Sequence, residues 1–464
     1  RALVCGTRGR WFESTLLYQK MTKEKKNKPS KELPLGFVDR QEKELLIRDF
    51  IISNIKEIMV KYGFQYLETP SFEYTDSIGK FLPDKDRPDQ GVFSFQDEKK
   101  WLSLRYDLTA PLARYVAKNY LEIPKPFKRY QLGTVWRNEK PGPGRFREFL
   151  QFDADFVGTK SLQADVELCV MVSEILDKCG LSKSDYIIKI SSRKITEELF
   201  KKINIVDENQ KLTALRALDK IDRLGWDGVK QLLGEGRKDK SGDFTKGANL
   251  SSKNIEIIEK ELKNKSPETE DLKEMLKIFD DYKFKNFEIN PTIIRGLEYY
   301  TGPIFEVNLK FDVKNDKGKV IQFGSIGGGG RYDNLVNNFG NYEAPATGIS
   351  IGLDRLVYAL MQKKEFKVKE SKPLVICIFD KSAMKEYINL QTLLRAAGIS
   401  VEIYPGEGKL KKQMEYANKI KSPAVILYGE NEIKSGKPTL RDLKSGTEKS
   451  IEIKELINEI KKII

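Results

Sequence analysis

Residues 145–155, Arg-Phe-Arg-Glu-Phe-Leu-Gln-Phe-Asp-Ala-Asp, combine side chains that could bind a phosphorylated ligand. Side chains alternate across a β-strand, so the odd-numbered residues share one face. That face begins with arginines, continues with Phe149 and ends with Gln151, Asp153 and Asp155, whereas the even-numbered residues are mostly apolar. The polar face suits a phosphate, a flat base and a cationic or hydrogen-bonding small molecule in a row. An ordinary amphipathic strand shows the same alternation.

Two arginines flank the turn that leads into this face. Arg137 ends a β-like run over 129–137, Arg145 opens the next run, and the prolines and glycines between them predict a hairpin with a long, stiffened tip. Two guanidinium groups in one pocket suit a polyphosphate, because each planar fork donates hydrogen bonds in pairs and keeps its charge. Phe149 lies two pleats beyond Arg145, where its ring could stack on an adenine.

A second candidate segment covers residues 290–302. It places Arg295 before Gly296, a charged side chain beside a backbone that permits close approach. Tyr299 and Tyr300 add a ring wall and a hydroxyl group. An ordinary loop followed by an edge strand has the same composition, so the segment indicates a binding site only in combination with the others.

Glycine-rich sequences at 325–333 and 347–355 supply further arginines. The glycines 327–330 would let a backbone pack against a flat ligand, which Arg331 could support, and a glycine turn into a helix places Arg355 at the start of that helix. The sequence has no G-x-G-x-x-G in a strand–turn–helix context and no G-x-x-x-x-G-K-[ST], so we predict neither a dinucleotide-binding fold nor a P-loop. Glycine turns that serve only packing are the alternative for each segment alone.

Composition restricts the chemistry. The chain of 464 residues has no histidine, which excludes Ser-His-Asp catalysis, Cys-His catalysis and a metal bound by histidine. The formal net charge of +14 favours an anionic partner such as a nucleic acid, although a lysine-rich composition gives the same charge without any ligand. The length allows two or three domains.

The four cysteines form no CxxC pair, and no apolar stretch has the length of a membrane span or the character of a secretory signal. These features favour a cytoplasmic protein that does not enter membranes.

We expect Met21 to be the true start of the chain, because a charged run follows it. Residues 1–20 would then be a non-native or disordered extension, with a short targeting peptide as the alternative.

Hydrophobic periodicity divides the chain. It predicts an amphipathic helix over 39–63 and a short strand over 66–70. Between 196 and 285 the sequence becomes rich in Lys and Glu and helical in pattern, which predicts an inserted helical subdomain. After a linker at 364–372, strands alternate with helices, as in a small parallel α/β domain.

Together these segments resemble the class II aminoacyl-tRNA synthetases, and specifically the histidyl-tRNA synthetases. Residues 137–149 resemble motif 2, residues 348–355 resemble motif 3, and Tyr-Leu-Glu-Thr-Pro at 66–70 resembles the motif 1 dimer region. Arg-Gly-Leu-Glu-Tyr-Tyr at 295–300 and Gly-Gly-Gly-Arg-Tyr-Asp at 328–333 resemble two signatures peculiar to the histidine enzymes.

The resemblance implies an α+β fold, with a class II synthetase catalytic domain built on an antiparallel sheet, a helical insertion and a C-terminal α/β anticodon-binding domain. The catalytic domain would comprise residues 21–195 and 286–363. The insertion domain would comprise 196–285, and the anticodon-binding domain would comprise 373–464.

The resemblance also implies ATP-dependent ligation of L-histidine to tRNA(His) through a histidyl-adenylate intermediate. ATP would act together with Mg²⁺, the protein would bind no structural metal, and the chain would form a homodimer. The alternative is a catalytically silent paralogue that regulates histidine biosynthesis or senses uncharged tRNA. The presence of all the expected phosphate-binding arginines disfavours that alternative.

By resemblance, Arg137 and Arg295 are the catalytic residues and hold the α-phosphate, with Arg295 in a role that a metal ion plays in related enzymes. The residues assigned to ATP are Arg137, Glu139, Arg145, Phe149 and Arg355. The residues assigned to histidine are Asp107, Thr109, Arg137, Gln151, Asp155, Arg295, Tyr299 and Tyr300. Asp107 and Asp155 stand where many relatives carry Glu, so their carboxylates reach less far.

Overall fold

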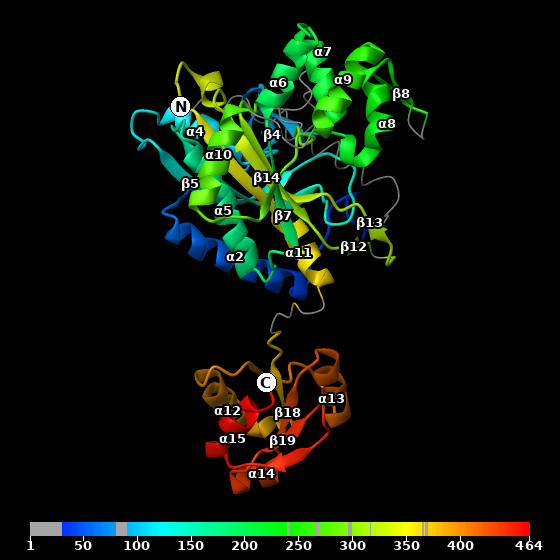
Figure 1. Cartoon of the computed structure of the whole chain (residues 1–464). Helices are drawn as coiled ribbons and strands as arrows, with labels where there is room; N and C mark the ends of the chain where they lie inside the picture. Colours follow the sequence, from blue (N-terminus) through cyan, green and yellow to red (C-terminus); the bar gives the residue numbers. More distant parts are fainter. Residues whose placement is uncertain are drawn as a thin grey trace, which may run out of the picture. The chain divides into compact units, whose positions relative to one another are not determined.

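The computed structural model describes residues 30–79, 91–238, 242–264, 269–295, 299–315, 317–363, 366 and 370–464. The chain divides into a first unit that ends at Phe366 and a second unit, Lys367–Ile464 (Figure 1). The predicted extension 1–20 and the proposed start at Met21 lie outside the described residues. No helix in the described part of the chain combines the length and the apolar character that crossing a membrane requires.

The first unit is built on an eight-stranded sheet with the strand order β1-β5-β6-β15-β14-β11-β7-β10. Neighbours pair antiparallel from β5 to β7, whereas β1 and β10 pair parallel at the two edges. The strands are β1 (Gln65–Tyr66), β5 (Phe127–Trp136), β6 (Glu148–Val157), β7 (Tyr186–Ser192), β10 (Phe287–Ile289), β11 (Pro303–Leu309), β14 (Ser325–Arg331) and β15 (Ala346–Gly352). The prediction of an antiparallel sheet is confirmed for all but its edges, and β5 and β6 form the predicted hairpin.

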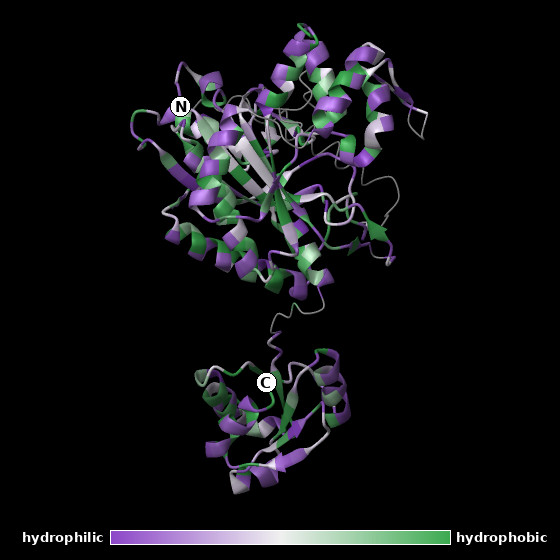
Figure 2. Ribbon diagram, viewed as in Figure 1, coloured by the Kyte–Doolittle hydropathy of each residue, from purple (hydrophilic) through white to green (hydrophobic). Residues whose placement is uncertain are grey.

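Helices pack against this sheet and against each other. α2 (Glu42–Lys61) buries Ile47, Ile51, Ile55 and Ile58, which recur at helical spacing, and it contacts α5 (Leu162–Lys178) and α11 (Leu353–Gln362). As predicted, α2 stops before Gly63, whose φ of 71° is a conformation that glycine adopts without strain. Figure 2 shows hydrophilic and hydrophobic residues alternating along these helices, as expected when one face is buried.

The glycine run is part of the sheet. Residues 327–330 lie within β14, between β11 and β15. A Cβ atom at Gly329 would lie 1.9 Å from the carbonyl oxygen of Gly348, and one at Gly327 would lie 2.6 Å from that of Ser350. The absence of side chains therefore permits the close packing of this strand.

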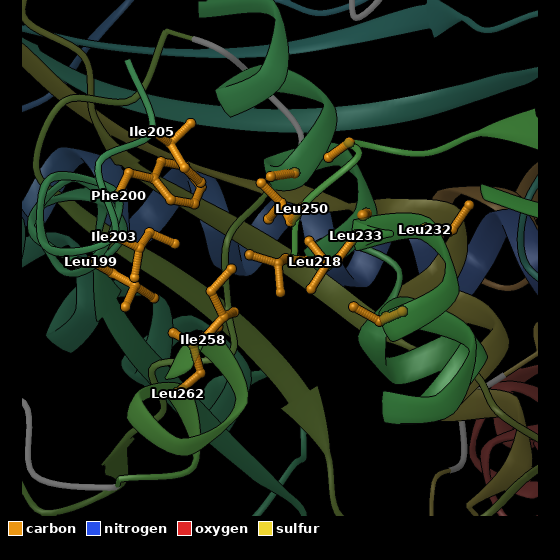
Figure 3. Packing of buried hydrophobic residues seen from close by; sticks show 14 of the residues in the cluster. Leu199, Phe200, Ile203, Ile205, Leu218, Leu232, Leu233, Leu250, Ile258 and Leu262 are labelled. Atoms are coloured by element: carbon orange, nitrogen blue, oxygen red, sulfur yellow. The ribbon is translucent and has the colours of Figure 1, made fainter. Parts of the chain in front are cut away.

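A helical segment with its own apolar core follows β7. It contains α6 (Arg193–Lys202), α7 (Glu208–Leu218), α8 (Ile221–Leu233) and α9 (Ser252–Lys263). Figure 3 shows the buried side chains that these helices share, which include Leu199, Phe200, Ile203, Leu218, Leu233, Leu250, Ile258 and Leu262. The predicted range 196–285 also contains α10 (Glu270–Asp281), which packs on α5 beside the sheet.

The second unit is a five-stranded sheet with the order β17-β16-β18-β19-β20. The predicted strands β16 (Leu374–Cys377), β17 (Val401–Ile403) and β18 (Ala424–Leu427) pair parallel, as expected. Two strands escaped prediction, β19 (Thr439–Asp442) and β20 (Glu448–Ser450), and both pair antiparallel. They are short and polar, so neither carries a clear period of two.

The packing of β14 generates a stability prediction. Gly329→Ala forces a Cβ atom against the backbone of β15, so we expect it to lower the free energy of unfolding of the first unit by at least about 2 kcal/mol. Gly142→Ala is the matched control, because a Cβ atom there meets nothing within 4 Å. Calorimetric scans of both variants check this. Equal unfolding midpoints would show that the strand has room which the structure does not indicate.

Candidate active site

One cavity of about 630 Å³ opens over the central strands of the first unit. Every residue that the sequence assigns to ATP or histidine lines it: Asp107, Thr109, Arg137, Glu139, Arg145, Phe149, Gln151, Asp155, Arg295, Tyr299, Tyr300 and Arg355. The sequence spreads these residues over a range of more than two hundred positions, and the antiparallel sheet gathers them.

Strand register positions the polar face of β6. Gln151, Asp153 and Asp155 lie opposite Gly352, Ser350 and Gly348 of β15. A Cβ atom at Gly348 would lie 2.0 Å from Oδ1 of Asp155. Glycine at this position therefore leaves the space that the carboxylate of Asp155 occupies.

Arg137 is held between aromatic rings. Its Nε donates to the carbonyl oxygen of Tyr106 at 3.1 Å, and its guanidinium carbon lies 4.6 Å from the ring centroid of Tyr106 and 5.2 Å from that of Phe149. Cation–π contacts of this kind fix the plane of a guanidinium group without neutralising it. The positive charge of Arg137 therefore remains available to a ligand.

Arg295 has a backbone conformation that is rare for a residue other than glycine, with a φ of 47°. Its guanidinium group packs on β14, where a Cβ atom at Gly328 would lie 1.9 Å from Nη1. Its buried Nε has no hydrogen-bond partner within the described residues. The side chain is thus oriented by packing and keeps a donor for a ligand. Gly296 lies outside the described residues.

Arg355 and Arg145 also line the cavity, close enough for their charges to interact. Arg355 lies 4.4 Å from the ring centroid of Phe323 and donates to the carbonyl oxygen of the same residue. Burial, together with the nearby charge of Arg145, lowers the pKa of Arg355 to about 10. An anionic ligand would relieve this repulsion between cations.

Glu139 has two partners among the side chains of the cavity. It forms an ion pair with Arg145 and accepts a hydrogen bond of 2.7 Å from the hydroxyl group of Tyr106. Burial alone would raise the pKa of Glu139, but the charges of Arg145 and Arg137 outweigh it and lower the pKa. The carboxylate is therefore ionised and stands ready to accept hydrogen bonds.

The acidic end of β6 is fully buried. Asp155 forms an ion pair of 3.1 Å with Arg129, its register partner on β5, and accepts a hydrogen bond from the hydroxyl group of Tyr332. Asp153 accepts from Nε2 of Gln151 at 2.7 Å. Burial is the first cause that raises the pKa of Asp107, Asp153 and Asp155, because it disfavours the charged form. Neighbouring carboxylates raise the pKa of Asp153 and Asp155 further, and the charge of Arg129 opposes the shift in all three.

Some residues of the cavity were missed. Tyr106, Asp153, Glu306 and Tyr332 line it, and Arg129 orients Asp155 from behind. Asp153 lies on the polar face formed by the odd-numbered residues of 145–155, so its position was a usable signal. Arg216, Asp219 and Lys220, from the end of α7 and the turn after it, also line the cavity, and nothing in their local sequence indicates this.

The expectation that Arg331 supports a flat ligand is wrong. Arg331 points toward the start of α5, where it pairs with Asp165 and donates to the carbonyl oxygens of Thr159 at 2.8 Å and Ser161 at 2.9 Å. The neighbouring glycines make room chiefly for protein groups. A Cβ atom at Gly330 would lie 2.9 Å from the ring of Tyr300.

Comparison with known proteins identifies the family. The family model described as histidyl-tRNA synthetase matches residues 36–356, and the one described as anticodon binding domain matches residues 372–463. This chain belongs to the histidyl-tRNA synthetase family. The chain therefore has the class II catalytic fold, followed by an anticodon-binding domain, as predicted.

Relatives support the same family. The histidine–tRNA ligase of Bartonella quintana is 46% identical over 460 residues, covering 93% of this chain and 92% of that protein. The histidine–tRNA ligase of Brucella ovis is 43% identical over 462 residues, covering 93% and 92%. The solved histidyl-tRNA synthetase of Nostoc sp. is 26% identical, covers 94% of this chain and 100% of its own, and superposes with a TM-score of 0.71.

Asp153 generates a prediction about pH. Burial and the charge of Asp155 raise its pKa to about 7, whereas the pKa of an unfolded aspartate is about 3.9. Between these values the folded state binds more protons than the unfolded state, so Asp153 makes the free energy of unfolding fall as the pH rises from about 4 to 7. Asp153→Asn removes this titration, and its stability relative to the wild type should rise with pH by up to about 1.4 kcal/mol per pH unit.

Thermal unfolding of the first unit at pH 5, 6, 7 and 8 measures this difference. Asp97→Asn, at an exposed position on β3 (Ser94–Asp97), controls for loss of a carboxylate. If the stability difference between Asp153→Asn and the wild type did not change with pH, Asp153 would titrate as an ordinary aspartate.

Proposed function

We propose that this chain ligates L-histidine to tRNA(His) in two steps, with histidyl-adenylate as the intermediate and ATP as the energy source. One observation carries the proposal. Arginines from the connection between β5 and β6, the 290–302 segment and the start of α11 line a single cavity whose other end is acidic. A triphosphate fits the cationic end, and the ammonium and imidazole groups of histidine fit the acidic end. No observation favours the catalytically silent alternative.

In the first step the histidine carboxylate attacks the α-phosphorus of ATP, a P–O bond forms, and the bond to pyrophosphate breaks. The carboxylate is already ionised, so the step needs no general base on the protein. It needs stabilisation of the charge that develops on the phosphoryl oxygens, and fixed cations provide it. Arg137 and Arg295, both held in place by packing, supply those cations.

The adenine and the outer phosphates of ATP occupy the part of the cavity that is lined by Phe149, Glu139, Arg145 and Arg355. Adenine stacks on Phe149, its exocyclic amine donates to Glu139, and Arg145 and Arg355 bind the outer phosphates. Arg145 must exchange Glu139 for phosphate when ATP binds, which replaces a one-to-one ion pair by contact with a polyanion. ATP binding therefore frees Glu139 to face the base.

Magnesium would accompany ATP. No group of three His, Cys, Asp or Glu side chains placed to hold a metal ion occurs among the residues described. The phosphates would supply most of the ligands, and Glu306 is a carboxylate of the cavity that could add one. When bound, Mg²⁺ neutralises charge on the outer phosphates, while this chain's arginines hold the α-phosphate.

Histidine occupies the acidic end. Its ammonium group is bound by Asp107, Thr109 and Gln151, and its imidazole lies between the tyrosine rings with an N–H donated to Asp155. Arg129 and Tyr332 hold Asp155 from the other side, so the orientation of the carboxylate is fixed before the substrate arrives. An imidazole carries one donor and one acceptor when neutral, which this mixture of carboxylate and hydroxyl groups can satisfy.

In the second step the 3′-terminal hydroxyl of tRNA(His) attacks the activated carbonyl carbon, and AMP leaves. The chain has no histidine to act as a base. A phosphate oxygen of the adenylate is the acceptor for the hydroxyl proton.

The second unit binds phosphates of the tRNA. It does so through exposed lysines at the start of α13 (Leu410–Lys419), namely Lys409, Lys411 and Lys412.

We also propose a cytoplasmic homodimer. A small sheet is formed by β2 (Phe72–Tyr74), β4 (Lys100–Leu104) and β3 in that order. It turns one aromatic face outward, with Phe72, Tyr74 and Phe95 exposed to 49%, 50% and 44%. Phe72 and Phe95 contact each other edge to face, with ring centroids 5.4 Å apart. A continuous aromatic surface of this kind is typical of a protein interface.

Arg295→Met tests the proposed chemistry. Loss of the cation should reduce histidine-dependent ATP–pyrophosphate exchange by at least about a hundredfold, the effect of removing one preorganised donor to a transition-state oxyanion. Arg441→Met, on β19 of the second unit, is the control for loss of an arginine and should retain activity. Full activity of Arg295→Met would remove this residue from the mechanism. No exchange by the wild-type chain would refute the proposed function.

The dimer is tested by sedimentation. The wild-type chain should sediment at twice 53.3 kDa, and Phe72→Asp, which introduces a charge into the aromatic face, should shift the population toward a monomer. Phe244→Asp is the control, since Phe244 is 65% exposed in the helical segment, away from that face. A wild-type monomer, or an unshifted Phe72→Asp dimer, would contradict this placement of the interface.

A further inference from the structure

The turn between α7 and α8 reaches into the active-site cavity from the helical segment. Lys220 lies in this turn and lines the cavity together with Asp219. Neither residue belongs to a motif of the first unit's sheet. The helical segment thus contributes charged side chains to the same space as the predicted ATP site.

Two interactions place this turn between the phosphate-binding arginines. On one side, the charge of Asp219 acts on Arg295. On the other side, Nε2 of Gln322 donates to the carbonyl oxygen of Asp222, and the next residue, Phe323, holds Arg355 through its carbonyl oxygen and its ring. The turn therefore lines the same cavity as Arg295 and Arg355, and the first turn of α8 is bonded to the residue before Phe323.

The side chain of Lys220 is partly buried in a cationic environment. Burial, followed by the charges of Arg223 and Arg216, lowers the pKa of its ammonium group despite the opposite effect of Asp219. A lysine so placed gains most from an anion of several charges, which compensates for burial and for the repulsion between cations.

A second cavity, of about 830 Å³, helps to decide whether Lys220 binds a nucleotide or a tRNA backbone. It is lined by one face of α6 and by α7, and it shares Arg216 and Tyr300 with the first cavity. Lys220 lines only the first cavity, in the company of Arg145, Arg295 and Arg355. Its position thus favours the nucleotide over a tRNA backbone that approaches along the helical segment.

We propose that Lys220 binds the β- and γ-phosphates of ATP and the pyrophosphate that leaves, so that the helical segment takes part directly in adenylate formation. This inference rests on the proposed function. It makes Lys220 a substrate-binding residue for the first step, and it gives the helical segment a role independent of tRNA.

Lys220→Met tests the inference, because methionine keeps most of the apolar stem and removes the charge. We expect the KM for ATP and that for pyrophosphate in the exchange reaction to rise about tenfold, the loss of one charge-assisted contact of about 1.4 kcal/mol. The KM for histidine should not change. Lys220→Arg should restore most of the affinity. Lys253→Met, at an exposed position on α9, is the charge-matched control and should behave as the wild type.

Two further measurements make the outcome decisive. Transfer of histidine to tRNA from preformed enzyme-bound adenylate should be unaffected by Lys220→Met. An unchanged KM for ATP, or a defect confined to the transfer step, would overturn the inference. The Kd of a non-hydrolysable ATP analogue, measured by calorimetry, tests the phosphate contact of Lys220 separately from the proposed function. A wild-type chain that catalysed no exchange but bound the analogue more tightly than Lys220→Met would refute the function and retain the phosphate contact.

Discussion

The arrangement of the site depends on the guanidinium group of Arg295, which packs against the glycine run 327–330 of β14. Arg295 lies flat on β14 because glycine at position 328 leaves the necessary space. The same strand has to lie close to β15, which carries Gly348 opposite Asp155. Glycine at these positions therefore fixes both ends of the cavity, the cationic end through Arg295 and the acidic end through Asp155. A larger residue would displace a functional group, not merely a neighbour in the core.

Charge imbalance at each end explains how the cavity selects its ligands. At the cationic end the repulsion between Arg145 and Arg355 is relieved only in part by Glu139. At the acidic end the charge of the buried Arg129 acts on Asp107, Asp153 and Asp155, and burial nevertheless raises the pKa of all three. Each end is thus incompletely neutralised in the free protein. Substrates of opposite charge complete the balance, and this makes the two ends specific for different groups.

The part of this site that lies on one hairpin was predictable from local patterns, whereas the grouping of distant segments rested on the resemblance to a family. The alternation along β6 predicted its polar face, and proline and glycine predicted the hairpin that joins it to β5. Edge and polar strands were harder, since β19 and β20 have neither length nor alternation. Arg331 was misassigned because its partner Asp165 lies 166 positions away, and no local pattern reveals such a pair.

Contacts made by tertiary packing account for the other omissions. Lys220 reaches the cavity only because the apolar core of the helical segment holds α7 and α8 beside the sheet, and a lysine in a polar turn carries no sign of this. Arg129 was overlooked for a related reason. It lies on β5 opposite Asp155, and its role follows from the register of two strands, which the alternation along each strand does not specify.

A crystal structure of the chain with a stable sulfamoyl analogue of histidyl-adenylate tests the central claim most directly. The account predicts the sulfamoyl oxygens between Arg137 and Arg295, the adenine ring on Phe149 and the imidazole beside Asp155. An analogue bound with its sulfamoyl group away from both arginines, or with the imidazole at the cationic end, would contradict it.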